Sequence, residues 1–190
     1  HPLRKMFDFF DGVFFSGWEE IHPMGFNQSE EDEGTFIFTL VTSGIFLLCP
    51  YMDEIDYVKF PDLMSEKERK SLSAYYKSSI QRFMYAQGSD KVFLSKNVMS
   101  TGRLNTIIEM FPKAKIVYIV RSPYAAVPSF ISMFSAAWKA HSPEIPENSK
   151  YHRAWGELAM DYYIYFHENI KKLPEPQWCV LKYEDLVAHP

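Results

Sequence analysis

The sequence predicts an α/β fold in which a parallel sheet is flanked by helices. Segments with the apolar spacing of helices alternate with short apolar runs, an order typical of parallel α/β proteins. The run 116–120 is apolar throughout, as in a strand that is buried on both faces of a parallel sheet. The 190 residues are 47% hydrophobic and 23% charged, which is an ordinary globular composition. We therefore expect a single α/β domain over residues 1–190.

The elements of the first half follow from local signals. Residues 35–49 form the longest apolar run, which we interpret as a buried helix ended by Pro50. Ser65 with Glu three residues later is a capping box, and the helix that it starts runs to Gly88. Residues 92–94 are expected to form a short buried strand. A second helix follows, with its apolar stripe at Leu104, Ile107, Ile108 and Phe111.

The second half continues the alternation after the strand 116–120. The next helix has a core stripe of Val127, Ile131, Phe134 and Trp138. Because proline is tolerated in the first turn of a helix, Pro128 predicts that this helix begins near residues 125–127. A long helix is expected over 148–172, with an apolar stripe of Trp155, Leu158, Tyr162, Phe166 and Ile170. A strand over 178–183 and a short helix from Glu184 complete the pattern.

The chain divides into two regions of different pattern. Residues 1–64 mix aromatic clusters with glycine and proline and predict irregular structure, whereas residues 65–190 have the regular helix and strand pattern of a core. Aromatic residues make up 17% of the chain, which favours a bulky core with deep pockets. The sequence starts without Met at His1 and stops at Pro190 after an acidic turn, and we expect a fragment truncated at both ends.

Charge and composition exclude several classes of protein. The net charge of −4 argues against a broad nucleic-acid surface but allows a local anion pocket. No apolar run approaches the roughly 20 residues that span a bilayer. Cys49 and Cys179 match no metal spacing, so we expect no metal site, and a reducing, cytoplasmic location is favoured.

Two strand ends are candidate binding positions, because ligands of open parallel sheets bind beyond the carboxyl ends of the strands. Arg121 follows the strand 116–120 and precedes a helix, whose free N–H groups favour anions. The planar guanidinium matches phosphate oxygens, and Ser129 is expected in the first turn nearby. Tyr183 lies at the carboxyl end of the other strand, which is expected over 178–183. The alternative is that Arg121 pairs with a carboxylate, that Ser129 only caps the helix, and that Tyr183 is a core residue.

Three segments of this region resemble the sulfotransferases that use 3′-phosphoadenosine 5′-phosphosulfate, in their broad, mostly microbial branch. Residues 115–134 resemble the segment that binds the 3′-phosphate, with Arg121, Pro123 and Ser129 at the matching positions. Residues 94–112 resemble the lead-in to that segment. Residues 181–186, LKYEDL, resemble the segment whose tyrosine lies against the adenine, here Tyr183. The resemblance covers roughly residues 92–190 and implies a fold like that of the P-loop NTPases.

The sequence also departs from this family. The Gly/Ser/Thr-rich loop that binds the 5′-phosphosulfate is missing, and we expect it upstream of His1. A catalytic histidine, common in relatives, is replaced by Val98 or Ser100 at the candidate positions. The acidic run 30–33 resembles a cluster of some relatives, which makes Glu31 and Glu33 candidate bases, although an acidic run can also cap a helix or lie in solvent. The alternatives for Lys96 are to stabilise the bridging oxygen of the phosphosulfate or to be an ordinary surface lysine.

The resemblance implies transfer of a sulfuryl group from 3′-phosphoadenosine 5′-phosphosulfate to a hydroxyl or amine of a small-molecule or carbohydrate acceptor, without a metal. Residues 1–64 would form much of the acceptor side. Residues 1–190 alone are expected to be inactive. One alternative is a P-loop kinase-like phosphotransferase. Another is a degenerate, non-catalytic homologue that serves as a nucleotide-binding or interaction domain. The sequence leaves the acceptor and the oligomeric state open.

Overall fold

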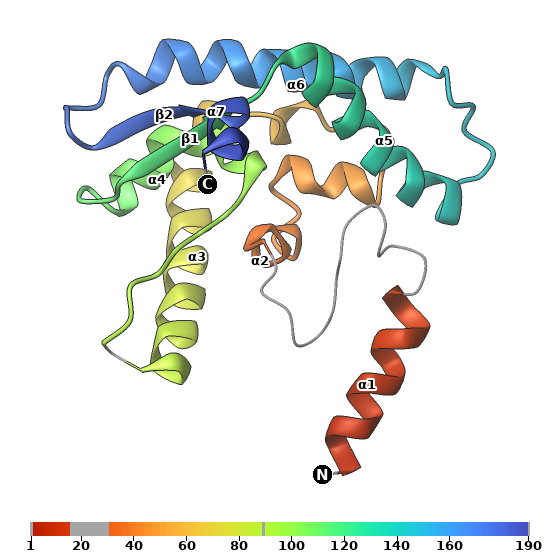
Figure 1. Cartoon of the computed structure of the whole chain (residues 1–190), viewed down its shortest axis with the longest axis horizontal. Helices are drawn as coiled ribbons and strands as arrows, with labels where there is room; N and C mark the ends of the chain where they lie inside the picture. The colour runs from red at the N-terminus through yellow and green to blue at the C-terminus, as the bar shows by residue number, and fades with distance from the viewer. Residues whose placement is uncertain (1, 16–30, 89, 190) are drawn as a thin grey trace.

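The structure is a computed structural model that describes residues 2–15, 31–88 and 90–189 (Figure 1). Its elements in chain order are α1 (Pro2–Phe15), α2 (Glu33–Ile37), η1 (Ser43–Leu47), η2 (Asp56–Val58), η3 (Pro61–Leu63), α3 (Glu66–Gln87), η4 (Val98–Arg103), α4 (Leu104–Met110), β1 (Ile116–Val120), α5 (Pro123–His141), α6 (Lys150–Ile170), β2 (Trp178–Lys182) and α7 (Tyr183–Ala188), where η marks a 3₁₀-helix. Helices and a small parallel sheet confirm the α/β expectation. In Figure 1, α5 and α6 lie along one side of the molecule, and α3 projects from the end near the sheet.

The sheet consists of β1 and β2, which pair in parallel from Ile116 opposite Trp178 to Val120 opposite Lys182. Helix α6 covers one face, where Tyr118 stacks on Phe166 with ring centroids 3.6 Å apart. On the opposite face Val117 and Ile119 are 57% and 50% exposed. The expectation that the run 116–120 is buried on both faces is therefore wrong within the described residues, since no described helix covers that second face.

The largest core cluster joins α5 and α6 to the segments before α3. Trp155 lies at its centre, stacked against Phe130 and in contact with Phe134 and Phe46. The indole N–H of Trp138 donates to the carbonyl of Phe46 at 2.7 Å and so ties α5 to η1. The predicted apolar stripes of both long helices are confirmed, because their central residues are buried in this cluster.

Residues 35–49 do not form the single buried helix that their composition predicts. Helix α2 ends at Ile37, Leu40 has a φ of 56°, and the chain re-enters helical structure only at η1. The Thr39 hydroxyl donates to the carbonyl of Phe36 at 2.6 Å, and Thr42 caps η1 through the N–H of Gly44. The hydroxyls of Thr39 and Thr42 thus form hydrogen bonds with backbone groups that would pair with each other in a continuous helix.

The capping box before α3 is confirmed by two reciprocal bonds, from the N–H of Glu68 to the Ser65 hydroxyl and from the N–H of Ser65 to the Glu68 carboxylate. Gly88 ends the helix with a φ of 106°. The strand expected at 92–94 is absent from the described chain. Val92 and Leu94 are 93% and 92% exposed, because no described strand lies where it could pair with this segment.

Helix α5 begins at Pro123, so the start predicted at residues 125–127 is wrong, and Pro128 lies inside the helix. The N–H groups of Ala125 and Ala126 both donate to the carbonyl of Ser122, at 2.9 Å each. Pro128 has no N–H to donate to the carbonyl of Tyr124, one turn earlier. Pro128 is exposed, so solvent at that face can bond this carbonyl instead.

The start of the chain is also more regular than predicted, since residues 2–15 form α1, an amphipathic helix. Trp18 and the rest of residues 16–30 lie outside the described chain. The cysteines Cys49 and Cys179 are both free. Across the described ranges, no helix combines the length and the apolar character needed to cross a membrane.

Candidate active site

The carboxyl ends of β1 and β2 bring together two of the residues predicted to bind a nucleotide. Since Val120 pairs with Lys182, the next residues of both strands, Arg121 and Tyr183, emerge side by side. The guanidinium carbon of Arg121 lies 4.8 Å from the ring centroid of Tyr183. A cation over an aromatic face leaves the N–H edge of the guanidinium available to an anion.

Backbone contacts fix this strand end. The Tyr163 hydroxyl on α6 donates to the carbonyl of Arg121 at 2.9 Å, and the N–H of Ser122 donates to the Glu184 carboxylate at 3.3 Å. Backbone N–H groups, those of Glu184 itself and of Ser122, lower the pKa of the Glu184 carboxyl, and Arg121 adds to the effect. The structure records no ion pair for Arg121 among the described residues, so the simple carboxylate pairing considered from the sequence is not what holds it.

Ser129 lies on the exposed face of α5 that it shares with Ala125 and Ser132. The N-cap of α5 is Ser122, so Ser129 is not the capping residue. Its hydroxyl makes no side-chain hydrogen bond within the described part of the chain. Since α5 begins at Pro123, Ser129 lies in its second turn and not in the first turn as the sequence predicted, and its side chain is exposed there.

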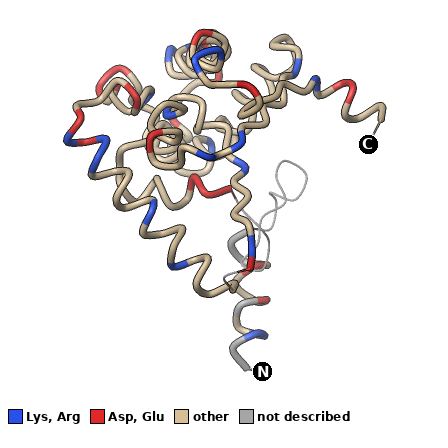
Figure 2. Tube along the Cα trace, turned by 90° about the vertical axis from the view of Figure 1, so that its left-hand side faces the viewer, with Lys and Arg blue, Asp and Glu red and all other residues tan. Residues whose placement is uncertain are grey.

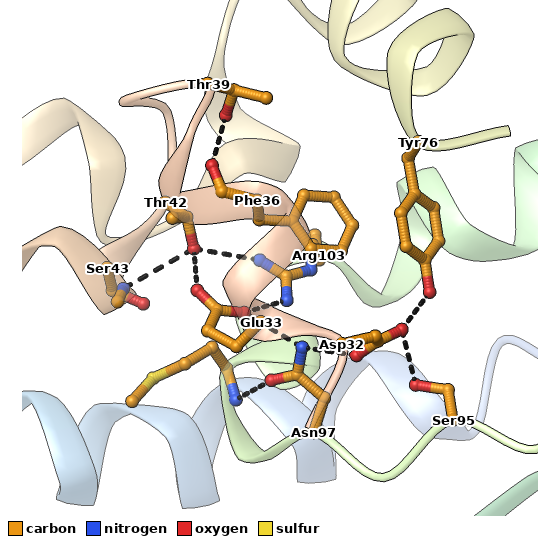
Figure 3. A network of polar contacts seen from close by, with 12 residues as sticks. Asp32, Glu33, Phe36, Thr39, Thr42, Ser43, Tyr76, Ser95, Asn97 and Arg103 are labelled. Carbon is orange, nitrogen blue, oxygen red and sulfur yellow. Dashed lines mark hydrogen bonds and ion pairs between the residues drawn. The ribbon is translucent and has the colours of Figure 1, made fainter. Parts of the chain in front are cut away.

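A second polar cluster lies where the acidic run before α2 faces residues 95–97 (Figure 3). Asp32 accepts hydrogen bonds from the Ser95 hydroxyl at 2.8 Å, from the Asn97 amide at 2.8 Å and from the hydroxyl of Tyr76 on α3. Burial, and then the bond to Asp32, raise the pKa of the Tyr76 hydroxyl. Tyr76 therefore stays a neutral donor to this carboxylate.

Glu33 is the buried member of the acidic run. One carboxylate oxygen accepts from the Thr42 hydroxyl, and the other accepts from both the Asn97 amide, at 2.8 Å, and the guanidinium of Arg103. Arg103 is 1% exposed, lies 3.6 Å from the centroid of the Phe36 ring, and also donates to Thr42 at 2.9 Å. Both oxygens of Glu33 are thus occupied by protein donors.

Glu31 is the member of the run that faces outward. Its carboxylate forms an ion pair with Lys96 at 3.0 Å, and the two side chains are 24% and 74% exposed. Lys96 lies in a segment without regular structure and not at the end of a strand as the sequence predicted. The structure therefore brings two of the three predicted catalytic side chains, Glu31 and Lys96, into direct contact and places Glu33 in a separate buried pair. Glu30, the first residue of the acidic run, lies outside the described chain.

Sequence reasoning missed the residues that organise this cluster, namely Thr42, Tyr76, Asn97 and Arg103. Arg103 was the one residue of this set that the sequence could have indicated. It stands at the start of an apolar helix, where a buried charge requires a partner of opposite charge. Its partner Glu33 is 70 positions away in the sequence, beyond the reach of local patterns.

Charges along the trace are mixed, with basic and acidic residues interspersed (Figure 2). Over the described residues, no three His, Cys, Asp or Glu side chains are grouped as metal ligands would be. The groups available for chemistry are therefore an arginine beside an aromatic ring at the strand ends, and a partly exposed carboxylate paired with an exposed ammonium.

These features and the matching sequence define the class: the chain belongs to the sulfotransferase family, whose family model matches residues 51–190. Among curated proteins it is similar to omega-hydroxy-beta-dihydromenaquinone-9 sulfotransferase Stf3 of Mycobacterium bovis and of Mycobacterium tuberculosis. Each is 29% identical over 100 residues, which are 53% of this chain and 26% of the relative. The matched part thus spans about a quarter of the length of these relatives. No solved structure gives a significant match. The resemblance to microbial sulfotransferases is confirmed.

Proposed function

We propose that this chain belongs to an enzyme that transfers a sulfuryl group from 3′-phosphoadenosine 5′-phosphosulfate to a hydroxyl group. The observation that carries the proposal is the contact of Arg121 with Tyr183 at the carboxyl ends of two paired parallel strands. This edge is where open α/β sheets bind nucleotides, and membership of the sulfotransferase family supports the chemistry.

In this proposal Arg121 and Ser129 hold the 3′-phosphate and Tyr183 lies against the adenine. The guanidinium supplies charge-assisted hydrogen bonds to phosphate oxygens, and the N-terminus of α5 adds the favourable end of the helix dipole. Ser122 and Glu184 fix the turn from which Arg121 and Tyr183 emerge. The residues of the strand ends therefore bind and orient the donor and do not take part in bond making.

Glu31 is the proposed general base, with Lys96 beside it. The acceptor oxygen forms a bond to sulfur while the bond between sulfur and the phosphate oxygen breaks. The acceptor proton passes to Glu31, and the electron pair of the broken bond remains on the leaving phosphate, where Lys96 offsets its charge. Glu31 suits this role better than Glu33, because Glu33 is buried and has both oxygens bonded to protein donors.

The loop that holds the 5′-phosphosulfate is proposed to lie outside residues 1–190, next to strands that complete a P-loop-like sheet. Two observations support this proposal. The described sheet has only two strands with one apolar face uncovered, and the matched relatives are much longer than this chain. Residues 1–190 then form one part of a single catalytic domain, with residues 1–64 on the acceptor side.

The relatives support a class of acceptor, because their name describes the ω-hydroxyl of a dihydromenaquinone. We propose an alcohol on an apolar chain as the first acceptor to examine. Aromatic side chains are abundant in residues 1–64, which suits an apolar acceptor.

The test is a transfer assay with the full-length gene product and donor labelled in the sulfuryl group. Farnesol, phenol and octyl glucoside serve as acceptors. Sulfation of one of them, with equimolar release of adenosine 3′,5′-bisphosphate, is the expected result. Phosphate transfer from ATP with Mg²⁺ would instead identify a kinase-like enzyme. Binding of adenosine 3′,5′-bisphosphate without transfer to any acceptor would favour a non-catalytic homologue.

A further inference from the structure

We propose that Asn97 is a positioning residue that holds Lys96 against Glu31, an inference that rests on the proposed function. Lys96 is 74% exposed and Glu31 is 24% exposed, and an ion pair that is open to solvent has little energy of its own to keep its geometry. Something else must therefore hold them in place if they act together on a substrate.

The structure sets three consecutive acidic residues, 31–33, against three consecutive polar residues, 95–97, and Figure 3 shows the contacts of Asp32 and Glu33 with Ser95 and Asn97. Glu31 pairs with Lys96, while the neighbours on either side of Lys96 bond the next acids of the run. Ser95 donates to Asp32, and the Asn97 amide donates to Asp32 and to Glu33. The backbone of Lys96 is thereby fixed from both sides.

The amide of Asn97 has its hydrogen-bonding groups in use. Its nitrogen reaches one oxygen of Asp32 and one of Glu33, each at 2.8 Å, and its oxygen accepts from the N–H of Met99 at 2.9 Å. The site requires two donors that face two carboxylates and one acceptor that caps η4. An uncharged amide meets all three needs, whereas a carboxylate at this position would face two others.

Glu33, which accepts a hydrogen bond from Asn97, is itself fixed by buried residues. Asn97 and Arg103 stand at the two ends of η4, and both bond the same carboxylate oxygen of Glu33. Glu33 is held in turn by Thr42, and a Cβ atom added at Gly44 would overlap the Glu33 side chain. The buried pair is therefore a fixed support, and Asn97 transmits its position to the exposed pair.

The experiment compares Asn97→Ala and Asn97→Asp in the full-length protein, with Trp138→Phe as a matched control. Trp138→Phe removes one buried hydrogen bond, from α5 to the carbonyl of Phe46 in η1, and leaves every polar group of the acidic cluster in place. For each variant, kcat for sulfuryl transfer, affinity for adenosine 3′,5′-bisphosphate and melting temperature are measured, with assays well below the melting transition.

We expect Asn97→Ala to lower kcat by about 100-fold, the size of effect that a misplacement of about 1 Å can have, with nucleotide affinity within twofold of wild type. Trp138→Phe should change the melting temperature but not kcat. Asn97→Asp should lose more activity at pH 8 than at pH 6, because a protonated carboxyl can still donate one hydrogen bond while a carboxylate cannot.

Two results would overturn the inference while the proposed function stands. One is wild-type kcat in Asn97→Ala. The other is a loss of kcat, nucleotide affinity and stability in the same proportion, which is what a purely structural role predicts. A wild-type protein that binds the nucleotide but sulfates no acceptor would instead overturn the proposed function, and the inference with it.

Discussion

Arg103 illustrates how a single residue links the acidic run to the fold. Its guanidinium is buried beside the Phe36 ring and paired with Glu33, and its Nε has no hydrogen-bond partner among the described residues. A buried ion pair contributes little net stability, but removal of one partner leaves an uncompensated charge inside the protein. The pair therefore acts as a constraint on α2 and η4 more than as a source of stability.

Arg103→Met should lower the free energy of unfolding by about 3–5 kcal/mol, the usual cost of breaking a buried pair. The double variant Glu33→Gln with Arg103→Met should recover part of this loss, because it leaves no unpaired charge. Urea unfolding of the three proteins measures both quantities. A loss below about 1 kcal/mol in the single variant would show that the pair is not buried in solution.

Glu31→Gln should reduce kcat by about 10²–10⁴-fold if Glu31 is the base, with nucleotide affinity unchanged. Glu33→Gln should act mainly on stability, since Glu33 is buried against Arg103. The exposed Glu157→Gln on α6 is a control for the loss of one carboxylate. If Glu31→Gln keeps full turnover, the acidic run serves only to support α2.

The sequence predicted the members of the site better than their arrangement. Arg121 and Tyr183 could be placed together because strand ends of a parallel sheet meet at one edge, and the structure shows them in contact. The contact of Glu31 with Lys96 could not be predicted, since the two are 65 positions apart and belong to segments without regular structure. The roles of all these residues, Ser129 included, stay predictions until they are tested.

At the scale of elements, local signals succeeded where the helix is defined by its own sequence. The capping box, the stop at Gly88 and the stripe of α6 are all confirmed. The prediction of a single helix over 35–49 was wrong, because the hydroxyls of Thr39 and Thr42 bond the backbone and interrupt the helix. The strand expected at 92–94 failed for another reason, because a strand requires a neighbour that the local sequence does not specify.

Helix α6 should make stability depend on pH through His152. Burial lowers the pKa of this imidazole below its ordinary 6.5, an effect that Glu147 opposes and Lys139 reinforces. On acidification the unfolded chain takes up the proton first, so the contribution present above pH 6.5 is lost as the pH falls toward the pKa of the folded state.

The melting temperature should therefore decrease from pH 7.5 to pH 5.5, and His152→Gln should make that decrease smaller. The exposed His167→Gln on the same helix is the control and should leave the decrease as it is in wild type. An unchanged pH dependence in His152→Gln would show that His152 is accessible to protons in the folded protein.

At the scale of the whole molecule, one face of the two-stranded sheet is apolar and uncovered among the described residues. Val117 and Ile119 on β1 lie beside Leu181 on β2, and all three are exposed. Exposed apolar strands with unpaired edges associate readily. In a longer protein, further strands and the segment with the phosphosulfate loop would cover this apolar face.

Residues 1–190 expressed alone should therefore be poorly soluble and should bind a dye specific for apolar surface, without sulfuryl transfer. Val117→Lys should raise the solubility of this chain but should destabilise a longer product in which the face is covered. Sedimentation, dye fluorescence and thermal melting measure these effects. A soluble 190-residue chain that melts cooperatively and sulfates an acceptor would show that the donor site is complete within it.

The most direct test of the central claim is calorimetric titration of the full-length protein with adenosine 3′,5′-bisphosphate. Arg121→Ala should weaken binding by about 1.5–3 kcal/mol, or roughly 10- to 150-fold in Kd, because charge-assisted hydrogen bonds to the 3′-phosphate are lost. The exposed Arg153→Ala on α6 should bind like wild type. Equal affinity of Arg121→Ala and wild type would contradict the assignment of the nucleotide site to the ends of β1 and β2.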